Sequence, residues 1–518
     1  MPPGRRGPLA DSYPGAVALV VLSLVPFLLL TVAVLPLAPV LARGVGLSPK
    51  ALDLVVALSD GAYAFGTVLA VQFAVHLRQR RMLLVYVSVF VVASALAAWA
   101  PAPAVWAAAF VVQGLCTSLM LIAAVPPLVT GWPPAKMPIT GTVMNLCVFG
   151  AVAAGPTLGG LEAGAGVWRP LFVGVAVLAL LALVFALLTW EDVGPADRDA
   201  PVDVIAIGLG AVGCAAAFFG AARLQTAAGG PVGAGALVPL IGGFGLLVAL
   251  VVYQYLHSRP LMPVRALATT APTAGILIAM FASAAGVGVM ELVLTGLQPV
   301  TSPGHAGLLF VAELGAAVVS AGLFGVLFRT RFTPVLALSG LALLVAAAAF
   351  AMGVTGPGYG GPTVVSAGLV GLGVGASVSP ALFIAGFSLR TSQTQRVFAM
   401  VELLRGVTAF LVAPVLLFLA TTLGASRAAG LRTGLWICLA LAAIGGLLAL
   451  GVWVAGGRGL QVPDLARWQE DDEPAWDSPP LLGRWRGRSG GASGGRASGG
   501  DRDRQGSKRR SSASWSGR

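Results

Sequence analysis

The chain has 518 residues, of which 57% are hydrophobic and only 10% charged, and its mean hydropathy is +0.90. A water-soluble protein of this length needs more surface charge, so the composition excludes a soluble enzyme and indicates a chain that crosses the membrane many times, because lipid solvates an apolar exterior. The net charge of +12 does not indicate nucleic-acid binding, since residues 479–518 alone contribute +8, with ten Arg or Lys and two acids.

Fourteen apolar runs are long enough to cross a hydrocarbon core of about 30 Å, which requires about 20 helical residues. The first is the least regular, because it holds Pro26, Pro36 and Pro39 and its end could lie at the interface. The sequence therefore predicts an all-α membrane protein with fourteen transmembrane helices. We place them near 15–42, 52–76, 82–100, 104–129, 136–161, 167–190, 203–223, 234–256, 272–297, 305–328, 333–355, 362–387, 396–421 and 432–456.

Basic residues in the short loops predict the orientation. Loops on the side of the two termini hold thirteen Arg or Lys, against six on the opposite side. Cytoplasmic loops carry the excess of positive charge, so we expect both termini in the cytoplasm. Only three of the 32 basic residues are lysines, and Ala, Gly and Val abound, which indicates GC-rich coding, so we expect a bacterial cell membrane.

A weak internal repeat divides the chain. Residues 71–86 and 321–336 each read as a helix end, a turn with two arginines one residue apart, and a new helix. We therefore expect two six-helix bundles separated by a central helix pair. The expected parts are a cytoplasmic tail 1–14, an N-terminal bundle 15–190, a central insertion 203–256, a C-terminal bundle 272–456 and a basic tail 457–518.

The tail after about residue 457 begins with an acidic stretch, 470–473, and ends rich in Gly, Ser and Arg. This composition cannot build a core, so we expect a disordered segment, and one that is dispensable for transport after about residue 479. Its arginines could contact anionic lipid. The four cysteines lie within apolar runs and the three histidines at span ends, so we expect no metal, no cofactor and no catalytic residues.

The fifth run contains the most distinctive motif, "GAVAAGPTLGGLEAGAGVWRPLF". Pro156 can bend a helix, and Gly155 with Gly159 lets another helix approach closely. The run, followed by Trp168-Arg169, resembles the antiporter motif of the Major Facilitator Superfamily, in its fourteen-helix drug:proton antiporter branch. "VAVLPLAP" in the first span, "VVQGL" in the fourth and "SPGHAGLLF" at the tenth add to the resemblance, which implies that Gly155, Pro156, Gly159 and Gly160 serve conformational exchange.

The chain departs from that family at other motifs. In the loop between spans two and three, the usual Gly-x-x-x-Asp-Arg-x-Gly-Arg-Arg keeps only its final basic pair, Arg80-Arg81. The arginine common in span four is Phe110, and the acid common in span one falls near Phe27. The family's proton-relay positions are thus replaced. The resemblance still implies cytoplasmic gating loops, here Arg78, Arg80, Arg81, Arg329 and Arg331.

Charged groups that remain within the apolar runs are the candidates for proton coupling or substrate contact: Asp60, Glu291, Glu313, Glu402 and Arg405. Each costs roughly 2.5–3.5 kcal/mol at mid-bilayer and tends to be functional or paired. Glu402 and Arg405 are spaced to pair on one helix. Asp60 and Glu313 lie eighteen and sixteen residues before the basic turns at Arg78 and Arg329, at similar depths of equivalent helices. Some of these carboxylates could instead be solvated near the headgroups. Asp53 and His76 lie near span ends, and we expect both to be solvated.

The sequence predicts a secondary transporter, which we expect to be monomeric. The first hypothesis is proton-coupled efflux of small amphipathic molecules by alternating access. An uptake symporter or facilitator on the same fold, or a non-transporting membrane scaffold, remain alternatives. We expect no nucleic-acid partner.

Overall fold

The computed structural model describes residues 7–189, 201–226, 233–356, 358–457 and 459–481. Fourteen helices in these ranges are long and apolar enough to cross a membrane, which confirms the predicted number and the all-α fold. The spans of the N-terminal half are α1 (Tyr13–Val45), α2 (Pro49–His76), α3 (Gln79–Trp99), α4 (Pro103–Thr130), a fifth span of η1 (Pro134–Lys136), α5 (Met137–Asn145), η2 (Leu146–Gly150) and α6 (Ala151–Ala165), and α7 (Arg169–Thr189).

The central pair is α8 (Val204–Thr226) and α9 (Ala234–Leu256), and a single turn, α10 (Val264–Leu267), follows it. The spans of the C-terminal half are α11 (Thr270–Leu297), α12 (Pro303–Leu309) with α13 (Val311–Leu327), α14 (Thr333–Ala351) with η3 (Met352–Thr355), α15 (Gly360–Phe387), η4 (Thr391–Gln393) with α16 (Thr394–Thr422), and α17 (Arg427–Ala455).

Helices α2 and α12 begin with the same signal, although they lie in different halves. Ser48 and Ser302 are the N-caps, and each side chain accepts a hydrogen bond from the backbone N–H three residues on. A proline follows each cap at the first helical position, where its missing N–H costs nothing. The shared start agrees with the internal repeat. The second span, α2, and the tenth span, α12–α13, occupy the same position in the two copies of the repeat.

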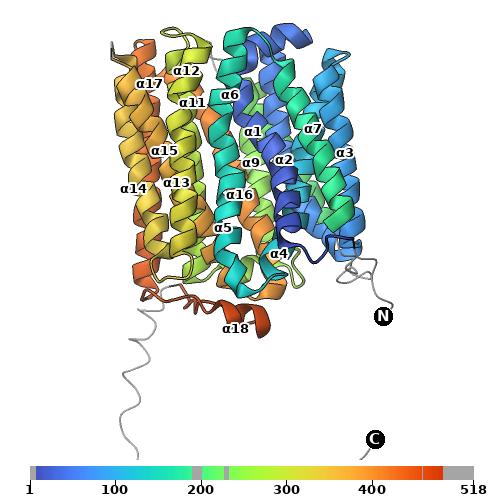
Figure 1. Ribbon diagram of the computed structural model, residues 1–518. Helices are drawn as coiled ribbons and strands as arrows, with labels where there is room; N and C mark the ends of the chain where they lie inside the picture. The colour runs from blue at the N-terminus through green and yellow to red at the C-terminus, as the bar shows by residue number, and fades with distance from the viewer. Residues whose placement is uncertain (1–6, 190–200, 227–232, 357, 458, 482–518) are drawn as a thin grey trace, which may run out of the picture.

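The two halves stand side by side, with α1–α7 on one side and α11–α17 on the other (Figure 1). Between them α2 packs against α16, α6 against α12, and α5 against α13. The central pair α8–α9 lies outside this seam, where α8 contacts both α2 and α16. We call the face where α1 begins and α17 ends the terminus face, and the opposite one the far face.

The prediction of disorder from residue 457 onward is wrong for the first part of the C-terminal tail. A short helix, α18 (Leu465–Glu470), lies across the terminus face, and residues 471–480 continue along it (Figure 1). Trp468 is 0% and Trp476 3% exposed, and both rings pack on Phe387. Two tryptophans thus anchor this strap, residues 464–480, to the helix ends. The average composition of the tail is polar and does not indicate that these two tryptophans are buried.

Backbone hydrogen bonds hold the strap to the C-terminal half, from Ala475 N to Phe387 O (2.8 Å) and from Thr270 N to Pro479 O (3.0 Å). Gln469 reaches the other half, where its Nε2 donates to the carbonyls of Thr130 and Trp132. The basic segment 482–518 lies outside the described residues.

Two truncations separate the strap from the basic segment. We expect a chain that stops at residue 481 to keep the thermal stability and transport of the full chain. A chain that stops at Gly457 also loses two buried tryptophans, and large-to-small changes at such positions cost about 3–5 kcal/mol each. Its melting temperature in detergent should therefore fall by several degrees. Equal melting temperatures for both truncations would contradict a structural strap.

Candidate functional site

A cavity of about 130 Å³ lies between the two halves. Its lining residues lie at the middle or in the far-face half of their helices, for example from Leu52 to Asp60 on α2 and from Ser283 to Glu291 on α11. The cavity therefore extends from mid-membrane toward the far face. Most of its wall is aliphatic or aromatic. The charged lining residues are Asp53, Asp60, Glu291, Glu313 and Arg405.

Two spans that border the cavity are interrupted. The fifth widens into the π-helical turn η2, which places Phe149 on the cavity wall. The tenth breaks at Phe310, so that α13 starts anew and Glu313 lies in its first turn. Such interruptions within membranes occur where a cavity is lined, and π-turns are frequent at functional sites.

Glu313 is the most deeply buried of the cavity acids. It is 3% exposed, and its Oε2 is buried with no hydrogen-bond partner among the described residues. The first turn of α13 favours a negative charge, because the helix dipole is positive there, but this does not satisfy the oxygen. A buried carboxylate without a partner requires a proton or a cation.

Asp60 and Glu291 face the same cavity and are half-buried. Asp53 lines the same cavity. A proton or a bound cation would relieve the repulsion among these three carboxylates. Asp53 lines the cavity because the first turns of α2 border it, and its solvation stays a prediction.

Glu402 and Arg405 form the predicted pair on one helix. Arg405 Nε donates to Glu402 Oε2 (2.9 Å), and its second terminal nitrogen bonds Oε1. Glu402 is 5% and Arg405 6% exposed. Glu402 also accepts a hydrogen bond from the Tyr63 hydroxyl (2.7 Å). The sequence does not predict this last contact, because Tyr63 lies in the other half.

The glycine motif of the fifth span packs on two neighbours. A Cβ on Gly155 would lie 2.9 Å from the backbone of α1, and a Cβ on Gly159 would lie 2.2 Å from Ala33 O. Gly160 faces the other half instead, where its Cβ would lie 2.7 Å from Pro303 O and 2.8 Å from the Cα of Gly307. The motif therefore brings α6 close to α1 and to α12 at once.

The terminus face is closed by contacts between the halves. Gln395 Nε2 of α16 donates to Ile122 O of α4 (3.0 Å). Deeper in the membrane, Asn145 Nδ2 donates to Gly375 O (3.0 Å), and the Ser379 hydroxyl donates to Asn145 Oδ1 (3.1 Å). These inter-half contacts are also absent from the sequence prediction, because a lone amide in an apolar run indicates no partner.

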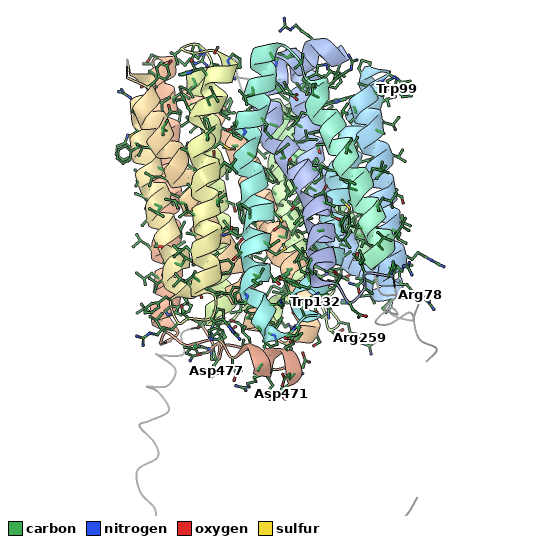
Figure 2. All side chains as sticks on the ribbon, in the orientation of Figure 1. Arg78, Trp99, Trp132, Arg259, Asp471 and Asp477 are labelled. Atoms are coloured by element: carbon green, nitrogen blue, oxygen red, sulfur yellow. The ribbon has the colours of Figure 1, made fainter. Side chains whose placement is uncertain are left out.

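The basic turns predicted as gating loops lie at the terminus face. Arg78 lies in the turn between α2 and α3, Arg80 and Arg81 lie in the first turn of α3, and Arg329 and Arg331 lie between α13 and α14. In Figure 2 Arg78 lies at the right edge of this face, whereas α13 and α14 stand at the left. The structure thus places the two turns on different sides of the face rather than together. Their role in gating stays a prediction.

The fold and cavity agree with a comparison of the sequence. Residues 20–300, more than half of the chain, match the family model described as Major Facilitator Superfamily. The chain belongs to the Major Facilitator Superfamily. Members of this superfamily are transporters, which agrees with a cavity between two helical halves and does not point to an enzyme.

Individual relatives are more distant. The chain is 30% identical over 203 residues to the uncharacterized MFS-type transporter YubD of Bacillus subtilis (strain 168), and 29% identical over 171 residues to its lincomycin resistance protein LmrB. These matches cover 38% and 33% of the chain and only 39% and 36% of the relatives. The crystal structure of the human organic anion transporter MFSD10 (TETRAN) shares the fold, with a TM-score of 0.58, 13% identity, and 85% of this chain and 99% of that chain covered.

Proposed function

We propose that the protein exports small amphipathic molecules from a bacterial cell in exchange for protons, by alternating access between its two halves. The observation that carries the proposal is the inter-half cavity with Glu313, whose buried Oε2 has no hydrogen-bond partner among the described residues. A carboxylate that faces a cavity can load a proton from one side and release it to the other. One proton that moves down 100 mV supplies about 2.3 kcal/mol.

The size of the cavity supports a moving-halves mechanism. Drug-sized ligands occupy sites of about 300–1,000 Å³, and about 130 Å³ is too small for them. The halves would have to move apart to admit such a ligand. The similarity to a lincomycin resistance protein supports export rather than uptake.

The experiment that tests the proposal measures substrate-dependent proton flux in proteoliposomes over a panel of lipophilic cations and secreted metabolites. Export coupled to protons predicts flux that stops when the pH gradient is collapsed. A facilitator would keep its flux without the gradient, a symporter would accumulate substrate together with protons, and a scaffold would move nothing.

We also propose that both termini are cytoplasmic. Single cysteines at Ala135 and Arg331, which are exposed on the terminus face, should be labelled by an impermeant maleimide only from the cytoplasmic side. A cysteine at Ala425, exposed on the far face, is the matched control and should be labelled only from outside. The four native cysteines are buried and give little background. Labelling of residues 135 and 331 from opposite sides would overturn the topology.

A further inference from the structure

The contact between α2 and α16 lies directly below the cavity, on the side of the terminus face. The cavity-lining residues of α2 end at Asp60, and Tyr63 follows almost one turn nearer the terminus face. Tyr63 is 1% exposed. Its hydroxyl donates to Glu402 Oε1 across the seam between the halves.

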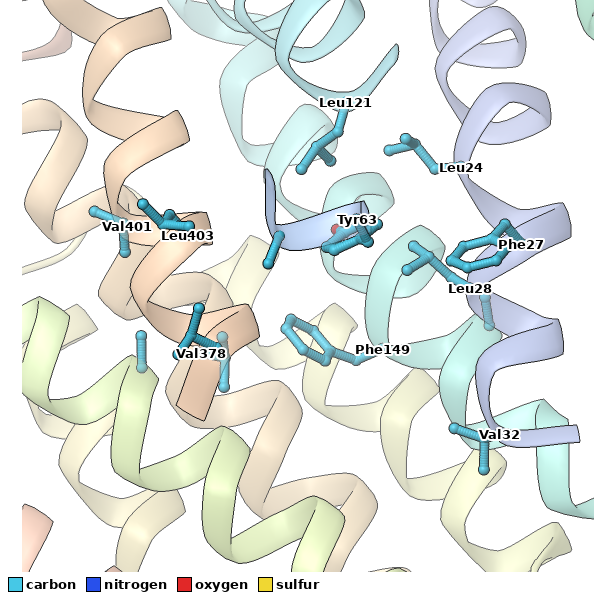
Figure 3. Close-up of a cluster of buried hydrophobic side chains, with 14 of the residues drawn as sticks. Leu24, Phe27, Leu28, Val32, Tyr63, Leu121, Phe149, Val378, Val401 and Leu403 are labelled. Carbon is cyan, nitrogen blue, oxygen red and sulfur yellow. The ribbon is translucent and has the colours of Figure 1, made fainter. Parts of the chain in front are cut away.

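The ring of Tyr63 is held by one aromatic side chain from each half. Phe27 of α1 stacks on it with a centroid distance of 6.3 Å, and Phe410 of α16 meets it edge-on at 6.1 Å. Figure 3 shows Tyr63 close to Phe27 and Leu28 of α1, with Val401 and Leu403 of α16 beyond it. Packing therefore fixes the ring, and the hydroxyl has little freedom to choose another partner.

Arg405 connects this contact to the cavity. Arg405 lines the cavity, its guanidinium donates two hydrogen bonds to Glu402, and Glu402 accepts a third from Tyr63. The three residues thus form one chain that starts at the cavity wall and ends in the opposite half. Hydrogen bonds with an ionised partner are about twice as strong as neutral ones, so this chain is a strong link across the seam.

We propose that Tyr63 is a positioning residue that couples the state of the cavity to closure of the terminus face. A ligand oxygen that draws the Arg405 guanidinium toward itself leaves Glu402 as a buried carboxylate with the Tyr63 hydroxyl as its remaining partner and no positive charge beside it. Such a charge destabilises the closed arrangement, and water can reach it only when the seam opens. The Tyr63 hydroxyl transmits this change to the other half, because it joins α2 to the Glu402–Arg405 pair. Without the hydroxyl the pair makes its hydrogen bonds within α16 alone.

The inference rests on alternating access in the proposed function, and its test requires neither a substrate nor a proton gradient. Spin labels on cysteines at positions 135 and 331 report the separation of the halves at the terminus face, in Tyr63→Phe and in the parent protein. Loss of a hydrogen bond to a charged group should raise the terminus-open population about tenfold.

Tyr86→Phe is the matched control. Tyr86 is buried like Tyr63, but its hydroxyl has no hydrogen-bond partner among the described residues. Tyr86→Phe removes the same hydroxyl oxygen as Tyr63→Phe but breaks no hydrogen bond between the halves. Its distance distribution should therefore equal that of the parent protein. Equal distributions in Tyr63→Phe, Tyr86→Phe and the parent would overturn the inference.

A second variant keeps the test decisive if Tyr63→Phe inserts poorly. Glu402→Leu combined with Arg405→Met replaces the pair by apolar groups and removes the acceptor of Tyr63. It should shift the distribution in the same direction, and addition of Tyr63→Phe should add nothing, because residues of one network are not additive. Full additivity, or no shift, would contradict the coupling.

Transport kinetics provide a second measurement, which a substitution with a purely structural effect would not change. Tyr63 lies behind the cavity wall, so Tyr63→Phe should change the maximum flux per folded molecule and leave KM near the parent value. If no panel compound is transported but the distances shift as described, the proposed function fails and the link stands. If flux is found but the distances do not shift, only the link fails.

Discussion

Flux driven by a proton gradient should fall to background in Glu313→Gln and in Asp60→Asn, while both proteins insert at parental levels. The amides keep the size and polarity of the acids but cannot titrate. Glu313 has a buried oxygen without a hydrogen-bond partner in the part of the chain that the structure describes, and Asp60 shares the cavity with Glu291. Both acids lie where a proton could be exchanged as the halves move.

The assay should separate coupling from binding. Counterflow, which exchanges labelled for unlabelled substrate without net proton movement, should persist in both variants. Glu162→Gln is the matched control, since Glu162 also has a buried oxygen without a hydrogen-bond partner among the described residues but does not line the cavity. If both mutants, singly and together, keep parental flux and its pH dependence, coupling moves to Glu291 or Glu402, or the facilitator alternative is correct.

The parts of the molecule that depend on local sequence were predictable. Hydropathy is a sum over neighbouring residues, so it located the fourteen spans. The Glu402–Arg405 pair follows from helical spacing alone. The repeat placed Asp60 and Glu313 in equivalent helices, and the structure brings both to one cavity.

The parts that depend on contacts between distant segments were not predictable. Tyr63 and Asn145 pair with residues more than 200 positions away, and neither stands out in an apolar run. The prediction of disorder for the strap is wrong for a different reason. Trp468 and Trp476 hold the strap in place, whereas the prediction rests on the polar average composition of the tail. Asp53 lies near a span end and also lines the cavity, which its position in the sequence does not indicate.

Replacement of Gly155 by Leu should abolish transport and leave insertion intact. Even a Cβ at this position lies 2.9 Å from Ala33 N and Leu29 O, and backbone atoms cannot give way as the end of a flexible side chain can. The helix α6 would have to move away from α1. Overpacking of this kind typically costs about 1–3 kcal/mol, which is compatible with folding but not with a seam that must re-form in every transport cycle.

A graded series tests whether the close approach itself is required. Gly159→Ala should reduce flux more than Gly155→Ala, because its Cβ would lie only 2.2 Å from Ala33 O. Gly174→Leu is the matched control: it makes the same change in a transmembrane helix where nothing lies within 4 Å of the new Cβ. Flux per inserted molecule is the measurement, with the melting temperature of each variant beside it. Parental flux in Gly155→Leu would show that α6 and α1 tolerate separation, and Pro156 and its neighbours would then be ordinary packing residues rather than a conformational motif.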